Sequence, residues 1–252
     1  MIPQFNLNKE YSFLENEIQK ELKKVFFEKN FIGGENVTQI EKNIAKYIGV
    51  NYAASCNSGT DALYLALNSI GIRKGDEVIT TPFTFISTIE AIIYLGAKPV
   101  FADIDLDTYN ISKEKILEKI SNKTKAILPV HIFGNPVDIR DIKKEVNDES
   151  IKIIEDCAQS FGAGINCQRV GSIGDIGCFS FYPTKNLGCY GDGGMITTNS
   201  EELYSNIKKL CNHGSSKKYH HDIIGINSRL DEIQASLLRV KLKYLGEITS
   251  HK

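Results

Sequence analysis

The chain has 252 residues, of which 42% are hydrophobic and 24% charged, a composition typical of a soluble globular protein with a substantial core. Its length favours one large domain over two small ones. A net charge of −1 gives no reason to expect nucleic acid or an anionic membrane as a partner. No apolar run approaches the roughly 20 residues needed to cross a bilayer.

The six cysteines include no Cys-x-x-Cys pair, so the sequence carries no recognisable zinc motif. In a chain of this length they are most simply explained as reduced thiols that pack as small core residues. Residues 1–5 show neither a basic region nor an apolar segment, so no secretory signal is visible. These features predict a cytoplasmic protein without a bound metal.

Helical and strand patterns alternate along the chain. Leu14, Ile18, Leu22 and Val25 repeat at three- and four-residue spacing and predict a helix within residues 12–29. A second helix is expected around 38–47, and later helices begin near residues 59, 84, 112, 139 and 200. The expected strands are 52–56, 77–80, 98–101, 125–130, 151–155, 178–181 and 195–198. Because these strands are nearly all apolar and have helices between them, we predict an α/β fold with a mainly parallel sheet covered on both faces.

A last helix is expected near the C-terminus. Ser228-Arg229-Leu230-Asp231 has the form of a capping box that would begin this helix at residue 228. An apolar stripe follows at helical spacing and extends to Leu242 and Leu245, so the helix needs a packing partner.

Two apolar runs each place a charged residue at or just beyond their ends. Asp156 ends the first run, and Lys185 follows the second, ahead of four glycines within residues 188–194. Such glycines indicate a backbone that turns tightly or approaches another group closely. With the nearby Ser180, these residues suit a pyridoxal phosphate pocket in which the lysine forms a Schiff base and the carboxylate faces the pyridinium nitrogen. On spacing alone, a structural role for Lys185 stays equally open.

Gly59-Thr60-Asp61 follows a strand and opens a helix, so its backbone N–H groups and the helix dipole would favour a phosphate. Many such turns only begin a helix, and that alternative stays open. Neither the dinucleotide glycine fingerprint nor the nucleotide P-loop is present, so the phosphate expected here is a cofactor's.

Other candidate residues have simpler explanations. Phe83 and Phe85 could pack in the core or stack on an aromatic ring, and core packing is the default. His131 is expected to be a hydrogen-bonded structural histidine. The polar stretch 213–221 is either a solvated loop or a rim that grips a phosphorylated substrate.

From about Ile32 to Lys243 the sequence resembles the pyridoxal-phosphate-dependent nucleotide-sugar aminotransferases of the DegT/DnrJ/StrS type. Six motifs carry this resemblance: SGTDAL at 58–63, PFTF at 82–85, PVH at 129–131, EDCAQ at 155–159, SFYPTKNLG at 180–188 and NSRLDEIQA at 227–235. The resemblance implies a fold-type I PLP-transferase large domain, with a mostly parallel sheet between helix layers. It also implies a homodimer with active sites at the subunit boundary.

The resemblance also implies residue roles. Lys185 would bind pyridoxal phosphate covalently, Asp156 would face its ring nitrogen, Gln159 would lie near its ring hydroxyl and Phe85 would stack on the ring. The phosphate would be held by Gly59, Thr60 and Asp61 through their backbone, by Ser180, and by Asn227 of the other subunit. Lys185 argues against a sister branch that dehydrates sugars and has histidine at this position.

The implied reaction moves an amino group, usually from glutamate, to a keto group of a nucleotide-diphosphate deoxysugar. Residues 182–185 and 217–221 look most like those of enzymes that aminate C3 of dTDP-3-keto-6-deoxyhexoses.

Chains of this family continue into a small C-terminal domain that closes over the substrate. Residues 1–252 would form the large domain, with the start of the helix that leads to the small domain near 228–252. The chain is then expected to be a fragment or a truncated product, and without the small domain Leu242 and Leu245 should be unusually exposed. A second hypothesis is a catalytically idle, cofactor-binding homologue that acts as an assembly partner.

Overall fold

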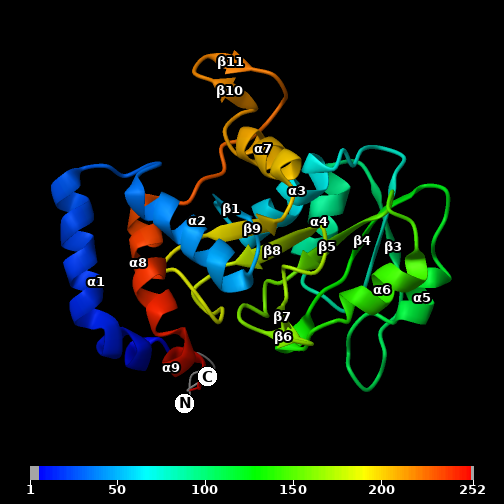
Figure 1. Ribbon diagram of the computed structural model, residues 1–252, viewed down its shortest axis with the longest axis horizontal. Helices are drawn as coiled ribbons and strands as arrows, with labels where there is room; N and C mark the ends of the chain where they lie inside the picture. The colour runs from blue at the N-terminus through cyan, green and yellow to red at the C-terminus, as the bar shows by residue number, and fades with distance from the viewer. Residues whose placement is uncertain (1–5, 251–252) are drawn as a thin grey trace.

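The computed structural model describes residues 6–250 (Figure 1). The prediction that no secretory signal is present falls on residues 1–5, outside the described residues. The helices are α1 (Asn8–Glu28), α2 (Glu35–Ile48), α3 (Gly59–Ser69), α4 (Ser87–Tyr94), α5 (Lys113–Leu117), α6 (Ile139–Val146), α7 (Glu201–Leu210), α8 (Glu232–Lys243) and α9 (Leu245–Ser250), with a 3-10 turn η1 (Ile132–Gly134). No helix within residues 6–250 combines the length and apolar character needed to cross a membrane.

A seven-stranded sheet forms the centre of the molecule. Its strands are β1 (Tyr52–Cys56), β2 (Glu77–Thr80), β3 (Lys98–Phe101), β4 (Thr124–Leu128), β5 (Lys152–Asp156), β8 (Ile176–Ser180) and β9 (Gly194–Thr198). They lie in the order β1-β9-β8-β5-β4-β2-β3. Neighbouring strands are parallel except where β9 pairs with β1 and β8. The predicted mostly parallel sheet is confirmed. Two small hairpins lie outside it: β6 (Gly164–Ile165) with β7 (Gln168–Arg169), and β10 (Ser215–Lys217) with β11 (His220–His221).

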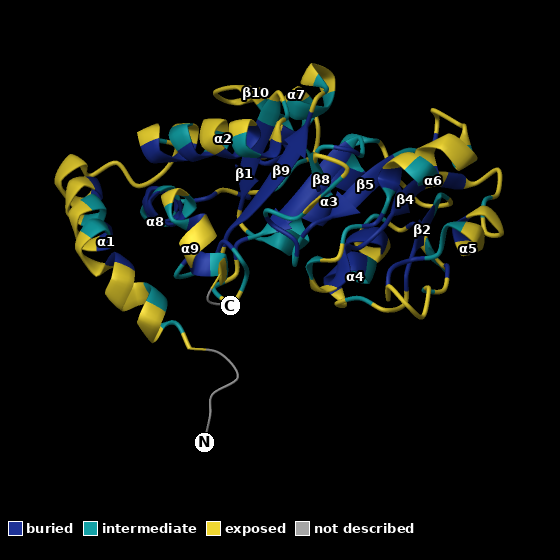
Figure 2. Ribbon diagram, turned by 60° about the horizontal axis from the view of Figure 1, so that its bottom comes forward, coloured by how far each residue is buried: buried dark blue, intermediate teal, exposed yellow. Residues whose placement is uncertain are grey.

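Successive strand residues point to opposite faces of the sheet, and each face has its own helical cover. Ile154 packs with side chains of α3, α4 and α7, whereas its neighbour Ile153 packs with those of α5 and α6. Phe179 and Met195 lie on the same side as α2 and α8. The strands therefore form a continuous buried layer between exposed helical surfaces (Figure 2).

Helix α8 begins later than the sequence predicts. Its N-cap is Asp231, whose carboxylate accepts the N–H of Gln234 at 2.8 Å. Ser228 is instead fully buried and donates its hydroxyl to Asp61 at 2.6 Å. The predicted capping box at Ser228 does not form, because the Asp61 carboxylate, which is distant in sequence, accepts the hydroxyl of this serine.

The apolar stripe of α8 is covered by α1, which lies beside it (Figure 1). Leu14 and Ile18 of α1 pack against Leu237 and Val240 of α8. Leu245 is only 5% exposed and Leu242 is partly buried against the same core as α2. The expected exposure of Leu242 and Leu245 is therefore wrong.

Five cysteines are buried free thiols, as predicted, and Cys167 in the β6–β7 turn is exposed.

Candidate active site

A cavity of about 460 Å³ lies at the carboxyl ends of the parallel strands. The strands β1, β5 and β8 deliver Ser58, Asp156 and Ser180 to it, and Gly193 enters just before antiparallel β9. Open α/β sheets commonly bind ligands in this position. The cavity is lined by Ser58, Gly59, Thr60, Leu63, Thr84, Phe85, Ser87, Thr88, Val130, Asp156, Ala158, Gln159, Ser180, Tyr182, Thr184, Lys185, Asp192 and Gly193.

Asp156 is the last residue of β5 and is 4% exposed. Its Oδ1 accepts the N–H of Ala158 at 3.1 Å, and its Oδ2 accepts the hydroxyl of Thr88 at 2.9 Å. Burial raises the pKa of Asp156, against the opposing effects of these two hydrogen bonds and of the charges of His131 and Lys185. The carboxylate is thus held in place at the wall of the cavity.

Lys185 lies in a tight turn after β8, where its N–H donates to Tyr182 O at 2.9 Å. Burial lowers the pKa of its amine, and Asp156 opposes that effect. Gly188 closes the turn, since a Cβ at this position would lie only 2.7 Å from Pro183 O. The turn therefore presents to the cavity an amine that loses its proton more readily than an exposed lysine.

The N-terminus of α3 forms a second wall. Ser58 caps this helix by accepting the N–H of Asp61 at 3.1 Å. The N–H groups of Gly59 and Thr60 have no acceptor among the residues that the structure describes. A Cβ on Gly59 would meet Ser180 Cβ at 2.6 Å, so glycine lets the helix start pack against the end of β8. Free N–H groups, the helix dipole and the Ser180 hydroxyl together suit a phosphate.

Gln159 and Phe85 lie at other parts of the wall. Gln159 Oε1 accepts the N–H of Phe133 at 2.9 Å, which leaves its amide N–H groups to act as donors. Phe85 lines the cavity with a side chain that is 69% exposed, and Phe83 is also exposed. The prediction that these phenylalanines pack in the core is therefore wrong.

Two other candidate residues lie apart from the cavity. The Asp61 carboxylate accepts the hydroxyl of Ser228. Its backbone N–H donates to the capping Ser58 at 3.1 Å, so the expected backbone contact from Asp61 to a phosphate would compete with this cap. Asn227 is exposed, and its backbone pairs with that of Asn212. The structure thus brings Gly59, Thr60, Phe85, Asp156, Gln159, Ser180 and Lys185 around one cavity and leaves the side chains of Asp61 and Asn227 outside it.

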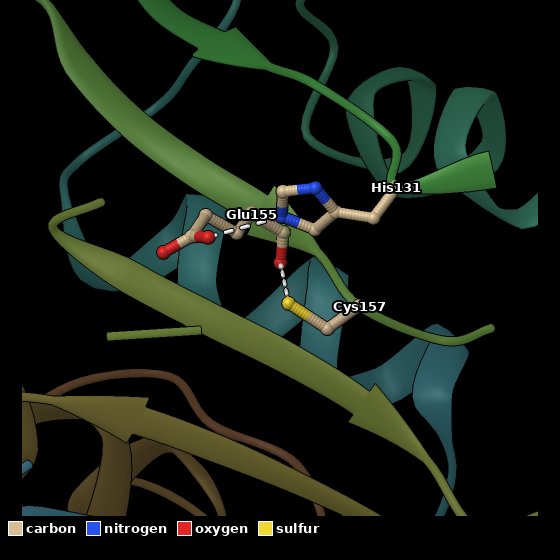
Figure 3. Close-up of side chains that lie close together, drawn as sticks. All are labelled: His131, Glu155 and Cys157. Atoms are coloured by element: carbon tan, nitrogen blue, oxygen red, sulfur yellow. Dashed lines mark hydrogen bonds and ion pairs between the residues drawn. The ribbon is translucent and has the colours of Figure 1, made fainter. Parts of the chain in front are cut away.

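His131, Glu155 and Cys157 form a buried cluster that resembles a metal site in its residue types (Figure 3). His131 Nδ1 accepts the N–H of Val137, and Nε2 lies 3.0 Å from Glu155 Oε2. Both oxygens of Glu155 also accept backbone N–H groups from residues 171–174. Because the ring nitrogens and carboxylate oxygens already have partners, we interpret the cluster as structural. His131 is the hydrogen-bonded structural histidine that the sequence predicts.

Sequence reasoning missed several polar side chains of the cavity wall. They are Ser58, Thr84, Ser87, Thr88, Tyr182, Thr184 and Asp192. One signal was present: Thr84 and Thr88 are four residues apart, just after a strand that ends at this edge of the sheet. The two hydroxyl groups lie 2.8 Å apart, with Thr84 just before α4 and Thr88 in its first turn.

Comparisons with known proteins agree with this geometry. The sequence profile of the DegT/DnrJ/EryC1/StrS aminotransferase family matches residues 13–252. A UDP-N-acetyl-3-dehydro-alpha-D-glucosamine 3-aminotransferase of Acidithiobacillus ferrooxidans is 47% identical over 97% of this chain and 66% of its own length. A dTDP-3-amino-3,6-dideoxy-alpha-D-galactopyranose transaminase of Aneurinibacillus thermoaerophilus is 45% identical over 98% of this chain and 68% of its own length. The chain thus spans about two thirds of these relatives.

Solved structures show the same fold. DesV of S. venezuelae superposes with a TM-score of 0.93 at 37% identity, over 98% of this chain and 66% of DesV. A DegT DnrJ EryC1 StrS aminotransferase of Brucella abortus gives 0.94 at 37% identity, over 98% and 68% of the two chains. The fold and the cavity define a pyridoxal-phosphate-dependent transferase of the mostly parallel α/β type. The chain belongs to the DegT/DnrJ/EryC1/StrS aminotransferase family.

The family is pyridoxal-phosphate-dependent, and the residues of the cavity fit this cofactor. The cavity offers a lysine amine with a lowered pKa, a buried carboxylate and unsatisfied N–H groups at a helix start. These groups match the aldehyde, the ring nitrogen and the phosphate of the cofactor in their chemistry.

Proposed function

We propose that the protein transfers an amino group from an amino acid, glutamate in the first instance, to the C3 keto group of a nucleotide-linked sugar. The observation that carries this proposal is the placement of Lys185, Asp156 and the N-terminus of α3 on one cavity. Over the whole reaction the donor becomes a 2-oxo acid, and the sugar C=O becomes a C–NH₂ group. The amino group and the keto oxygen exchange places, so no oxidant or reductant is needed.

Lys185 would hold the cofactor covalently through Nζ, and Asp156 would hold the proton on its ring nitrogen. Gly59 and Thr60 N–H groups and the Ser180 hydroxyl would bind the phosphate. Gln159 would donate to the ring hydroxyl, and Phe85 would cover one ring face. When bound, pyridoxal phosphate supplies a ring that withdraws electrons from the α-carbon of the amino acid.

Lys185 would also move a proton. A lysine can accept a proton at Nζ only while its amine is neutral, and burial lowers the pKa of Lys185 in the required direction. Asp156 must stay ionised while it is buried, and the hydrogen bonds from Ala158 and Thr88 oppose its protonation.

The identity of the nucleotide-linked sugar is a more specific question. The relatives named above act on UDP-linked and dTDP-linked sugars, and both names place nitrogen at C3. We propose a dTDP-3-keto-6-deoxyhexose as substrate, with the UDP-linked 3-keto sugar as the alternative that the assay distinguishes. The 213–221 segment, which includes β10 and β11, is mostly exposed and does not line the cavity of its own chain. We propose that it grips the diphosphate.

We further propose a homodimer in which Asn227 of one subunit completes the phosphate site of the other. Support comes from the position of Asn227, which is exposed and outside the cavity of its own subunit.

Borohydride reduction of the cofactor-loaded protein, followed by digestion and peptide mapping, tests the site. A tag on Lys185 is expected, and a tag elsewhere or none overturns the proposal. The activity test supplies glutamate with the dTDP-linked or the UDP-linked 3-keto sugar and measures 2-oxoglutarate, with Lys185→Ala as control. A tagged protein that is inactive with both sugars would instead support an idle, cofactor-binding homologue.

A further inference from the structure

Two hydroxyl groups, one half-buried (Thr84) and one buried (Thr88), form a chain that ends on Asp156. Thr88 Oγ1 lies 2.9 Å from Asp156 Oδ2, and Thr84 Oγ1 lies 2.8 Å from Thr88 Oγ1. An ionised carboxylate can only accept, so Thr88 gives its single hydroxyl proton to Asp156. Thr84 must then donate to Thr88. The direction of the whole chain is therefore fixed by the charge of the carboxylate.

Thr88 is well placed to fix this carboxylate. It is 1% exposed and lies in the first turn of α4, which packs against the same face of the sheet as α3. The second oxygen of Asp156 is held from a different element, by the N–H of Ala158 at 3.1 Å. A carboxylate with each oxygen bound from a different direction cannot rotate freely, and each oxygen keeps a further acceptor position.

We propose that Thr88 is a positioning residue that holds Asp156 as an anion in a fixed orientation toward the ring nitrogen of the cofactor. Thr84 acts one step behind it by orienting the Thr88 hydroxyl. This inference rests on the proposed function, because it assigns to Asp156 the role of facing the cofactor ring.

The surroundings of Asp156 show why this hydroxyl matters. Burial raises the pKa of Asp156, while Ala158, Thr88, His131 and Lys185 act against that rise. The nearby thiols of Cys157 and Cys178 stay neutral, since burial raises the pKa of each well above the ordinary cysteine value. Loss of the Thr88 hydroxyl removes one of two direct hydrogen bonds to a buried anion. Neither thiol replaces it, because Cys157 donates to Glu155 O and Cys178 to Ala62 O. Because a hydrogen bond to the charged form lowers the pKa of a carboxyl group, its loss should raise the pKa of Asp156.

The test compares Thr88→Val with Thr88→Ser in the cofactor-free protein. Valine keeps the shape of threonine without its hydroxyl, whereas serine keeps the hydroxyl. The pKa of Asp156 is measured by ¹³C NMR of its carboxyl carbon, assigned with Asp156→Asn. We expect a rise of about 1 in Thr88→Val and little change in Thr88→Ser. Thr84→Val should shift it in the same direction by less, because it disturbs only the orientation of Thr88.

Thr80→Val is the matched control. Thr80 is also fully buried, but its hydroxyl donates to Leu128 O at 2.8 Å and not to Asp156. It should lose stability as Thr88→Val does, yet leave the titration of Asp156 unchanged. If Thr88→Val does not fold, Thr88→Ser and Thr84→Val still give the comparison.

Cofactor affinity gives the second readout. We expect the dissociation constant of pyridoxal phosphate to rise about tenfold in Thr88→Val and to be restored in Thr88→Ser. If Thr88→Val leaves the Asp156 titration unshifted while the wild-type protein carries the borohydride tag on Lys185, the role of Thr88 alone is overturned. Absence of the tag from the wild-type protein overturns the proposed function, and the cofactor role of Thr88 with it.

Discussion

The Nε2 atom of His131 lies 3.0 Å from Glu155 Oε2, and both side chains are completely buried. Because His131 Nδ1 accepts the N–H of Val137 at 2.9 Å, the ring proton is on Nε2 and is donated to the carboxylate. Glu155 also accepts backbone N–H groups within residues 171–174. It therefore joins His131 and that loop to the strand that ends in Asp156.

This arrangement predicts a pH-dependent loss of stability in Glu155→Gln. Burial alone would raise the pKa of Glu155, but the hydrogen bonds from His131 and the loop outweigh it and leave the pKa lowered. A lowered pKa gives stability that is present above the ordinary Glu value of about 4.3 and lost as pH falls through the folded value. We expect Glu155→Gln to lower the free energy of unfolding by about 2–4 kcal/mol at neutral pH.

Urea denaturation at several pH values checks this. The difference between wild type and Glu155→Gln should shrink below about pH 4. The exposed Glu149→Gln is the control and should change little at any pH. A deficit in Glu155→Gln that stays constant to the lowest pH would contradict the explanation.

Lys185→Met should stabilise the cofactor-free protein at neutral pH. Burial lowers the pKa of Lys185, with Asp156 opposing, so between the folded and unfolded values the unfolded chain binds more protons. Stability then rises with pH in that window, and a neutral methionine avoids burying the ammonium. We expect the melting temperature to rise at pH 7, with the gain disappearing above the ordinary lysine pKa of about 10.4.

Thermal unfolding of Lys185→Met and of the exposed control Lys42→Met, at neutral and strongly alkaline pH, measures this effect. A gain that is equal at both pH values would show that it comes from packing and not from the charge of Lys185.

The charged residues that follow the strands could be predicted from the sequence, because the patterns that indicate them lie within a few neighbouring residues. Asp156 closes an apolar run and Lys185 sits in a glycine-rich turn, and the fold places both on one cavity. The position of β9 between β1 and β8 could not be predicted, because pairing across the sheet depends on contacts distant in sequence.

The same reason explains the error at Ser228. Local pattern favoured it as an N-cap, but Asp61, 167 residues away, accepts its hydroxyl and Asp231 caps the helix. The hydrogen bond of Thr88 could not be predicted, because its partner Asp156 lies 68 residues further along the chain. Specific side-chain partners of this kind depend on the complete fold.

Lys241 provides a prediction on stability and cofactor binding. It is fully buried on α8, with Nζ 2.5 Å from Glu10 Oε1 and 4.6 Å from the ring centroid of Tyr190, and it donates to Gly188 O. Lys241→Met would leave the Glu10 carboxylate without this cation, so we expect a loss of about 3–5 kcal/mol in the free energy of unfolding. Because Gly188 ends the turn that holds Lys185, cofactor affinity should also fall.

Urea denaturation and cofactor titration test Lys241→Met, and Glu10→Gln combined with it should recover part of the stability. The control is Lys243→Met, because Lys243 is largely exposed and its pair with Glu17 spans 3.6 Å. This control should change stability by less than about 1 kcal/mol. A double variant as unstable as Lys241→Met alone would mean that the loss does not come from an unpaired Glu10.

The proposed sharing of sites between subunits predicts complementation. Lys185→Ala and Asn227→Ala should each be impaired as pure homodimers. When the two are unfolded together and refolded at equal concentration, half of the dimers contain one subunit of each kind. If Asn227 serves the partner's cavity, each mixed dimer has one site with both residues, and activity should recover to about a quarter of wild type.

If Asn227 acts within its own subunit, every site in the mixture lacks one residue and no activity returns. The control is a mixture of Lys185→Ala with Lys185→Met, which cannot produce an intact site under either arrangement. Borohydride tagging gives a readout independent of turnover, because the Asn227→Ala subunit should bind pyridoxal phosphate more tightly in the mixed dimer than in its own homodimer. Equal affinity in the two dimers would place Asn227 outside the phosphate site of the partner.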